Sequence, residues 1–132
     1  MTKTYHDKDV QDWNVNDFIR YMDDLHQELF GLEYLPHGSW SAERGRIGRD
    51  IGTQRKAGKY DKEVIKRFID HCFKTYQPSV KYPGTNYGFC ATYRRQDLQR
   101  IILAVEQERK ENEIQTKQED GISDEVIDWF GS

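Results

Sequence analysis

The sequence is poor in cysteine and in long apolar runs, and each lack excludes a class of protein. It has only two cysteines, Cys72 and Cys90, which is too few for a small secreted protein stabilised by several disulfide bonds. No stretch approaches the roughly 18 consecutive apolar residues of a membrane span. Residues 1–13 lack the apolar run of a signal peptide. We therefore expect a cytoplasmic protein with reduced thiols and no membrane contact.

Apolar residues are scarce, since 36% of the 132 residues are hydrophobic and 33% are charged. A chain of this length is most simply one domain with a single core. The composition suits a small, strongly solvated helical domain followed by a tail that does not fold by itself. We expect a flexible N-terminus over 1–12, a helical domain over 13–108, and a charged linker and acidic-aromatic tail over 109–132.

No catalytic or cofactor-binding signature is present. The glycine-rich stretch 41–61 contains neither GxxxxGK[ST] nor GxGxxG, and no strand-like segment precedes it. His71 and Cys72 are adjacent on an expected helix, so they cannot both face one metal ion. The sequence also lacks CxxC and HxxxH spacings. We expect a non-enzymatic protein with no cofactor and no bound metal.

The net charge of −3 conceals a basic middle between two acidic ends. Residues 1–41 hold 3 basic and 8 acidic residues, and residues 101–132 hold 3 basic and 9 acidic residues. Residues 42–100 hold 14 basic and 6 acidic residues, a balance of +8. Such asymmetry indicates polyanion binding, or an acidic tail that competes for the same basic surface.

Apolar spacing predicts an all-α fold, a small bundle of about four helices. The first expected helix begins after Asn14, a suitable N-cap, and ends at Gly31. A second begins after Asp61, also a suitable N-cap, and ends before Pro78. Further helices are expected over 41–53 and from about Arg94 to Glu113. Residues 79–93 are rich in aromatics, proline and glycine, which predicts one turn or short hairpin. A flexible acidic C-terminal tail completes the expected fold.

The stretch 41–61 supports two interpretations that the sequence leaves open. One is a helix packed on the core with a solvated basic side; the other is a helix that contacts nucleic-acid phosphates. A helix-turn-helix formed with 61–76 is a variant of the second, although the connection is longer than usual for that motif. On the phosphate-binding interpretation, the contacting residues are Arg44, Arg46, Arg49, Arg55, Lys56, Arg94 and Arg95.

Two further segments carry candidate binding residues. Tyr87 and Tyr93 lie beside the Arg94-Arg95 pair, a combination that stacks bases and neutralises phosphates, unless these rings complete the core. In the acidic tail, large apolar side chains typical of a partner-binding motif recur at Val126, Ile127, Trp129 and Phe130. The tail would bind a partner protein or dock on its own basic domain.

The chain resembles small open reading frames of bacteriophages and mobile elements. The resemblance covers about residues 13–105 and rests on WNVNDFIRYMDDLHQELFG, RGRIGRD, KYDKEVIKRFIDHCFKTY and YPGTNYGF. It implies an accessory protein of the host-cell cytoplasm that acts in DNA replication or on a host machine. The tail is similar in style to the partner-recruiting tails of single-strand binding proteins, although Gly131 and Ser132 follow its aromatics.

Two functions from different classes follow. The first is a nucleic-acid-binding accessory protein, with DNA favoured over RNA, whose tail engages a host or phage replication or transcription protein. The alternative is an inhibitor or adaptor of a host polymerase, helicase or defence protein that does not itself bind nucleic acid.

Overall fold

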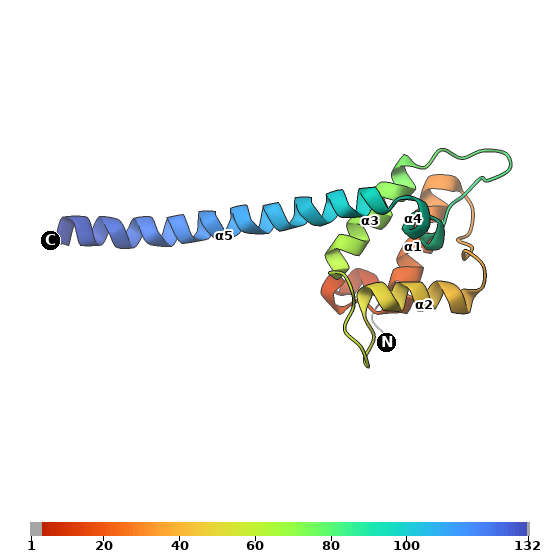
Figure 1. Cartoon of the computed structure of the whole chain (residues 1–132), viewed down its shortest axis with the longest axis horizontal. Helices are drawn as coiled ribbons and strands as arrows, with labels where there is room; N and C mark the ends of the chain where they lie inside the picture. The colour runs from red at the N-terminus through yellow and green to blue at the C-terminus, as the bar shows by residue number, and fades with distance from the viewer. Residues whose placement is uncertain (1–3, 132) are drawn as a thin grey trace. The chain divides into compact units, whose positions relative to one another are not determined.

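The chain is all-α, as expected from the sequence. The computed structural model describes the backbone of residues 4–131 and the side chains of residues 4–114. Within this range it contains five α-helices, two short 3-10 helices and no β-strand (Figure 1). In chain order, the elements are η1 (Tyr5–Asp7), η2 (Val10–Asp12), α1 (Val15–Phe30), α2 (Trp40–Ile51), α3 (Lys62–Thr75), α4 (Tyr87–Tyr93) and α5 (Arg95–Gly131).

The chain divides into two units, Met1–Ile101 and Ile102–Ser132. The first holds α1 to α4 and the start of α5, and the candidate site lies within it. The second consists of the rest of α5. The sequence predicted a last helix from about Arg94 to Glu113 followed by a flexible tail, whereas the backbone of α5 is helical to Gly131. The expected flexibility of the tail stays a prediction.

The core of the first unit is built around α3. The helix predicted here from apolar spacing is confirmed, and six of its apolar side chains are buried: Val64, Ile65, Phe68, Ile69, Cys72 and Phe73. Asp61 caps the helix, as predicted, by accepting a hydrogen bond from the Glu63 backbone N–H at 2.8 Å. Helix α1 packs against α3 and contributes the buried Phe18 and Met22. Burial of these apolar side chains supplies most of the driving force for folding.

Helix α1 begins at a reciprocal capping box. The Asn14 side chain accepts a hydrogen bond from the Asp17 N–H, and the Asp17 carboxylate accepts one from the Asn14 N–H, both at 2.9 Å. Lys8 Nζ donates to the same carboxylate at 3.0 Å. Burial of Asp17 favours its neutral form, but the Asn14 amide and the Lys8 ammonium outweigh burial and lower the pKa of the carboxyl.

Residues 5–12 belong to the folded unit, which corrects the expectation of flexibility for this part of 1–12; residues 1–3 lie outside the described residues. Tyr5 is buried, and its ring centroid lies 5.3 Å from that of Trp13. The Trp13 indole Nε1 donates to the Tyr5 carbonyl at 3.1 Å. The Lys62 ammonium donates to the Gln11 carbonyl at 3.0 Å and so joins this segment to the start of α3.

The aromatic segment after α3 contains a bend followed by a short helix. The bend lies at Val80 and Lys81, where the Ser79 N–H donates to the Tyr82 carbonyl at 3.1 Å. The possibility of a hairpin is wrong, because Tyr87–Tyr93 form α4. Asn86 caps this helix, and its side chain accepts from the Phe89 N–H at 2.8 Å. Asparagine is common both in turns and at helix N-caps, and here Asn86 is an N-cap.

The buried imidazole of His26 fastens two loops onto α1. Its Nδ1 lies 2.7 Å from the Leu32 carbonyl, and its Nε2 accepts from the Thr85 N–H at 3.2 Å. These partners require the neutral tautomer with the proton on Nδ1. The loop that follows α1 and the loop that precedes α4 are therefore held at the same end of the unit.

The lowered pKa of Asp17 predicts an acid-dependent stability. The carboxylate stabilises the fold above the unfolded-state pKa near about 4, and this contribution is lost as the pH falls through the lower folded-state pKa. We expect Asp17→Asn to lower the free energy of unfolding by about 1–2 kcal/mol near neutral pH. Urea unfolding followed by circular dichroism should show the difference from the parent shrinking below about pH 4. A difference that is the same at all pH values would contradict this role.

Candidate nucleic-acid interface

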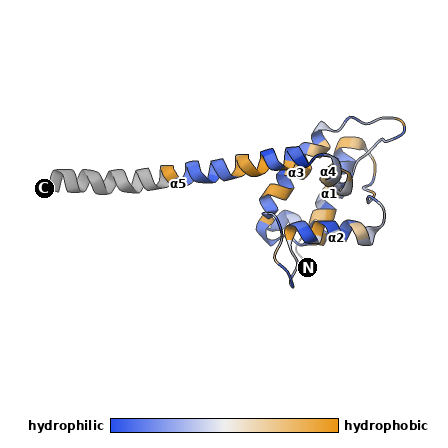
Figure 2. Cartoon of the chain, in the orientation of Figure 1, coloured by the Kyte–Doolittle hydropathy of each residue, from blue (hydrophilic) through white to orange (hydrophobic). Residues whose placement is uncertain are grey.

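A tight basic loop, Gly52–Gly58, connects α2 to the segment before α3. Gly52 has a φ of 94°, and a Cβ at Gly58 would lie 2.3 Å from the carbonyl carbon of Ile51. Only glycine fits where the two arms of the loop come this close. Between them, Thr53 N–H donates to the Lys56 carbonyl at 2.8 Å. In Figure 1 the loop extends from the C-terminal end of α2, and Figure 2 shows its tip as hydrophilic.

Two backbone hydrogen bonds anchor the chain that leaves this loop. Lys59 N–H donates to the Arg49 carbonyl at 3.2 Å, and Tyr60 N–H donates to the Asp50 carbonyl at 2.8 Å. Both acceptors lie in the last turn of α2, whose final carbonyls have no partner within the helix. The loop therefore presents Arg55 and Lys56 from a closed, anchored backbone.

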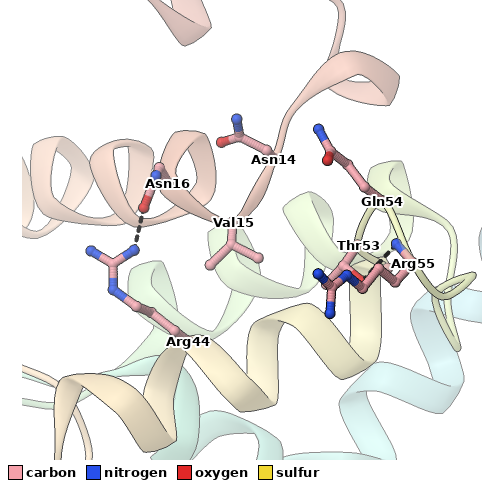
Figure 3. A pocket seen from close by; sticks show the side chains of 8 residues that line it. Asn14, Val15, Asn16, Arg44, Thr53, Gln54 and Arg55 are labelled. Carbon is pink, nitrogen blue, oxygen red and sulfur yellow. Dashed lines mark hydrogen bonds between the residues drawn. The ribbon is translucent and has the colours of Figure 1, made fainter.

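A cavity of about 490 Å³ lies between the loop, α2 and the first turn of α1 (Figure 3). The residues that line it are Asn14, Val15, Asn16, Arg44, Gly52, Thr53, Gln54 and Arg55. They supply two guanidinium groups and three side-chain amides, with no carboxylate. The nearby Asp17 is buried and paired with Lys8, so its charge is compensated. The cavity is therefore an electropositive site rich in hydrogen-bond donors.

The structure brings Arg44 and Arg55 together, and sequence reasoning missed the amides between them. Arg44 Nη1 donates to the Asn16 side-chain oxygen, which orients the guanidinium across the cavity (Figure 3). Asn14 was recognised as a helix cap but not as a cavity residue. No pattern along the chain could have paired Asn14 and Asn16 with Gln54, because their proximity comes from the packing of α1 on α2.

Arg46 and Arg49, two other predicted phosphate contacts, form ion pairs with the buried Glu43 and Asp50 on the α4 side of α2. Arg46 Nη1 donates to the His37 carbonyl at 2.8 Å and lies 3.6 Å from Glu43 Oε1. Arg49 Nε donates to Asp50 Oδ1 at 3.1 Å. The predicted basic surface of α2 is thus divided, with Arg44 directed toward α1 and the other two arginines toward α4.

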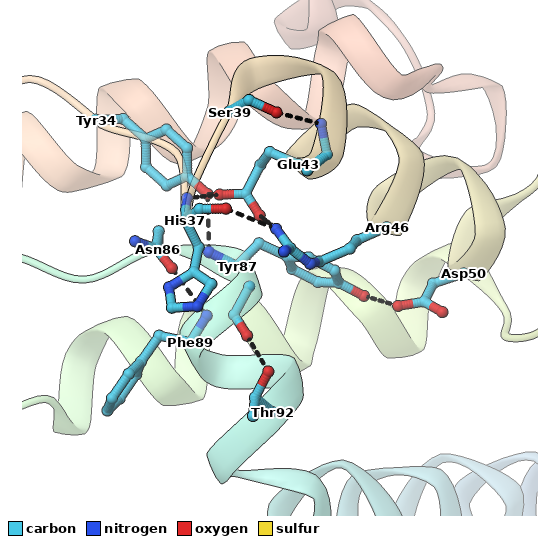
Figure 4. A network of polar contacts seen from close by, with 12 residues as sticks. Tyr34, His37, Ser39, Glu43, Arg46, Asp50, Asn86, Tyr87, Phe89 and Thr92 are labelled. Atoms are coloured by element: carbon cyan, nitrogen blue, oxygen red, sulfur yellow. Dashed lines mark hydrogen bonds and ion pairs between the residues drawn. The ribbon is translucent and has the colours of Figure 1, made fainter.

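The acids that these arginines brace belong to a buried polar network (Figure 4). Glu43 is fully buried, and its Oε2 accepts from the Tyr34 hydroxyl at 3.0 Å and from the His37 N–H at 2.8 Å. Tyr87 N–H donates to the Tyr34 oxygen at 2.8 Å, and the Tyr87 hydroxyl donates to Asp50. Burial, together with the neighbouring carboxylates, raises the pKa of both phenols, so they stay protonated donors.

The prediction that Tyr87 stacks on bases is wrong, because its side chain is completely buried in this network. Tyr93 differs, since 68% of its surface is exposed. The sequence favoured both rings equally because both lie in an aromatic run beside arginine. The helical geometry of α4 separates them, as positions 87 and 93 face different sides of the helix.

Arg94 and Arg95 lie at the opposite end of α3 from the basic loop. Arg94 Nη2 donates to Thr75 Oγ1 at 3.0 Å, at the last residue of α3, whereas the loop leads into its first turn. The 14 residues of α3 separate these ends by about 20 Å. Arg94 is also paired with Asp97, with Nε and Oδ2 2.5 Å apart. The two arginines therefore belong to a different surface from Arg44 and Arg55.

The predicted partner-binding residues Val126, Ile127, Trp129 and Phe130 lie outside the residues whose side chains are described, so their role stays a prediction. Among the side chains that are described, no three His, Cys, Asp or Glu residues are grouped so that they could hold a metal ion. In the described part of the chain, no helix is long and apolar enough to cross a membrane.

The hydrogen bond from the buried Tyr87 hydroxyl to Asp50 can be tested by substitution. Tyr87→Phe removes the hydroxyl that donates to the buried Asp50 carboxylate, which would keep only its Arg49 partner. We expect the free energy of unfolding to fall by about 1–3 kcal/mol, measured by urea denaturation. Tyr93→Phe is the matched control, because its exposed hydroxyl makes no comparable buried contact. Equal stability of the two variants would contradict the network.

Comparisons with known proteins do not assign the chain to a family: no family model, no curated protein and no solved structure matches it.

Proposed function

We propose that the chain is a non-enzymatic protein that binds the phosphate backbone of nucleic acid at the loop face. The loop face consists of the cavity with Arg44 and Arg55, together with Lys56 on the adjacent loop and Lys59 directly after it. The observation that carries the proposal is the composition of the cavity, which combines two guanidinium groups with three amides and contains no carboxylate.

This donor set suits phosphate. A guanidinium group offers paired N–H donors that match two phosphate oxygens, and it remains charged at all physiological pH values. Asparagine, glutamine and threonine side chains are common phosphate contacts beside arginine in nucleic-acid complexes. Since such contacts carry no base information, the loop face by itself predicts binding that depends weakly on sequence.

The net negative charge of the chain does not oppose this proposal. Residues 51–60 carry Arg55, Lys56 and Lys59 and no acidic residue. Charges farther away than about 8–10 Å are largely screened at physiological salt. Asp17, which accepts from the Asn14 N–H beside the cavity, is paired with Lys8. A bound phosphate would therefore sense the cations of the loop face more strongly than the distant acids of the chain.

Salt dependence is the direct test of this proposal. Fluorescence anisotropy with labelled single-stranded and duplex DNA should show binding at about 50 mM salt that weakens steeply by about 200 mM, because the bound phosphates release their counterions. An RNA strand of the same sequence should be measured in parallel, because contacts to the phosphates alone do not distinguish RNA from DNA. Absence of binding to every one of these probes at the lower salt concentration would overturn the proposal.

The double substitution Arg44→Ala/Arg55→Ala should weaken binding and reduce its salt dependence. We expect the slope of log affinity against log salt to fall by about 0.7–0.9 for each phosphate that the variant no longer neutralises. Lys110→Ala is a charge control, because it removes an exposed cation of α5 outside the loop face. A variant of the loop face whose affinity and slope match those of the Lys110 variant would exclude these arginines from the interface.

A further inference from the structure

A second cavity, the aromatic groove, is lined by rings from three separate segments. It measures about 430 Å³ and is bordered by His37, Tyr76, Tyr82, Gly84, Thr85, Asn86, Phe89 and Tyr93. Tyr76 follows α3, Tyr82 lies in the loop before α4, and Phe89 and Tyr93 lie on one side of α4. Like the cavity of the loop face, the groove contains no carboxylate.

The rings of the groove are held in place before any ligand arrives. The centroids of Phe89 and Tyr93 are 4.9 Å apart, and those of Tyr76 and Phe89 are 6.1 Å apart. The Tyr76 hydroxyl donates to the Tyr82 carbonyl at 2.7 Å, which fixes the loop against the end of α3. Tyr82 and Tyr93 nevertheless remain 60% and 68% exposed. The groove is thus a preformed surface with two accessible aromatic side chains.

The segment that supplies every lining residue of the groove except His37 carries only basic charges, whereas Glu33 lies in a neighbouring cavity that shares Tyr82. Residues 74–96 include Lys74, Lys81, Arg94 and Arg95 and no aspartate or glutamate. Lys81 Nζ lies 5.5 Å from the ring centroid of Tyr82, so one cation directly borders an exposed ring. The adjacent Asp97 is occupied by ion pairs with Arg94 and Arg100. An occupant that combines planar rings with negative charge matches these surroundings better than a neutral peptide does.

We propose that the aromatic groove binds unpaired bases of single-stranded nucleic acid, with stacking on Tyr82 and Tyr93. Base stacking on aromatic side chains beside a basic track is the usual way in which proteins hold single strands with little sequence preference. Paired bases in a duplex are stacked on one another, and their faces cannot reach these rings. This inference rests on the proposed function and specifies the form of nucleic acid that the protein selects.

The test compares single-stranded and duplex probes on the full chain. Tyr82→Ala/Tyr93→Ala should be measured against a fluorescent oligothymidine and a DNA hairpin with the same number of phosphates, its stem closed by a non-nucleotide linker so that it has no unpaired bases. We expect affinity for the single strand to fall by about tenfold or more, as for removal of a stacked base, while affinity for the hairpin stays within about twofold. The salt slope should not change, because no phosphate contact is removed.

Folding of this variant should be preserved. The Tyr82 side chain makes no hydrogen bond among the described residues, since its loop contacts to Ser79 and Tyr76 use the main chain. Val80→Ala, at a fully exposed position in the same loop, controls for general changes of the loop. Tyr82→Phe/Tyr93→Phe keeps the rings and should retain single-strand affinity. Circular dichroism confirms that each variant has parental helix content and melting temperature.

A spectroscopic readout reports stacking directly. A strand that carries 2-aminopurine in place of one thymine should lose fluorescence on binding to the parent and to the Tyr→Phe variant, and less on binding to the Tyr→Ala variant. An equal decrease of single-strand and hairpin affinity in the Tyr→Ala variant, or no decrease in either, would overturn the proposal for the groove and leave the loop face standing. Failure of the parent to bind any nucleic acid would overturn both proposals.

Discussion

The arrangement of the first unit depends on the burial of one carboxylate, that of Glu43. A charge removed from water must be compensated by hydrogen bonds and opposite charge, or it destabilises the fold by several kcal/mol. Glu43 Oε2 accepts hydrogen bonds from the Tyr34 hydroxyl and the His37 N–H. Its Oε1 has no hydrogen-bond partner among the described residues and is compensated by the Arg46 guanidinium 3.6 Å away. These partners come from the loop after α1 and from α2 itself, and Tyr34 in turn accepts from the start of α4. Satisfying one charge thus fixes the mutual positions of three segments, including His37 at the aromatic groove.

The two proposed surfaces lie at opposite ends of the same unit and differ in chemistry. The loop face carries the cationic side chains of Arg44 and Arg55, whereas the aromatic groove carries the exposed rings of Tyr82 and Tyr93. A single strand that spans the length of α3, about 20 Å, would engage both surfaces in turn. A duplex would engage only the first. If both proposals hold, the combination would convert weakly selective phosphate binding into a preference for unpaired nucleic acid.

Much of the fold follows from local sequence signals, whereas the candidate sites do not. The caps at Asn14 and Asp61 and the apolar stripe of α3 are short-range patterns, and the structure confirms them. The role of Tyr87 was missed because burial is decided by packing between α4 and α2, which no local pattern encodes. Arg46 looked as available as Arg44 for the same reason. The short helix α4 was missed because Asn86 is equally suited to a turn and to a helix cap.

The closed geometry of the Gly52–Gly58 loop has a consequence for the speed and cost of association. Ordering a flexible backbone on binding costs about 1–2 kcal/mol for each residue that becomes fixed. Here the crossing at the two glycines and the Thr53–Lys56 hydrogen bond impose that order during folding. Arg55 can then meet an incoming phosphate without a preceding rearrangement of the main chain. Association at this face should consequently be limited by diffusion and electrostatic attraction instead of by a conformational step.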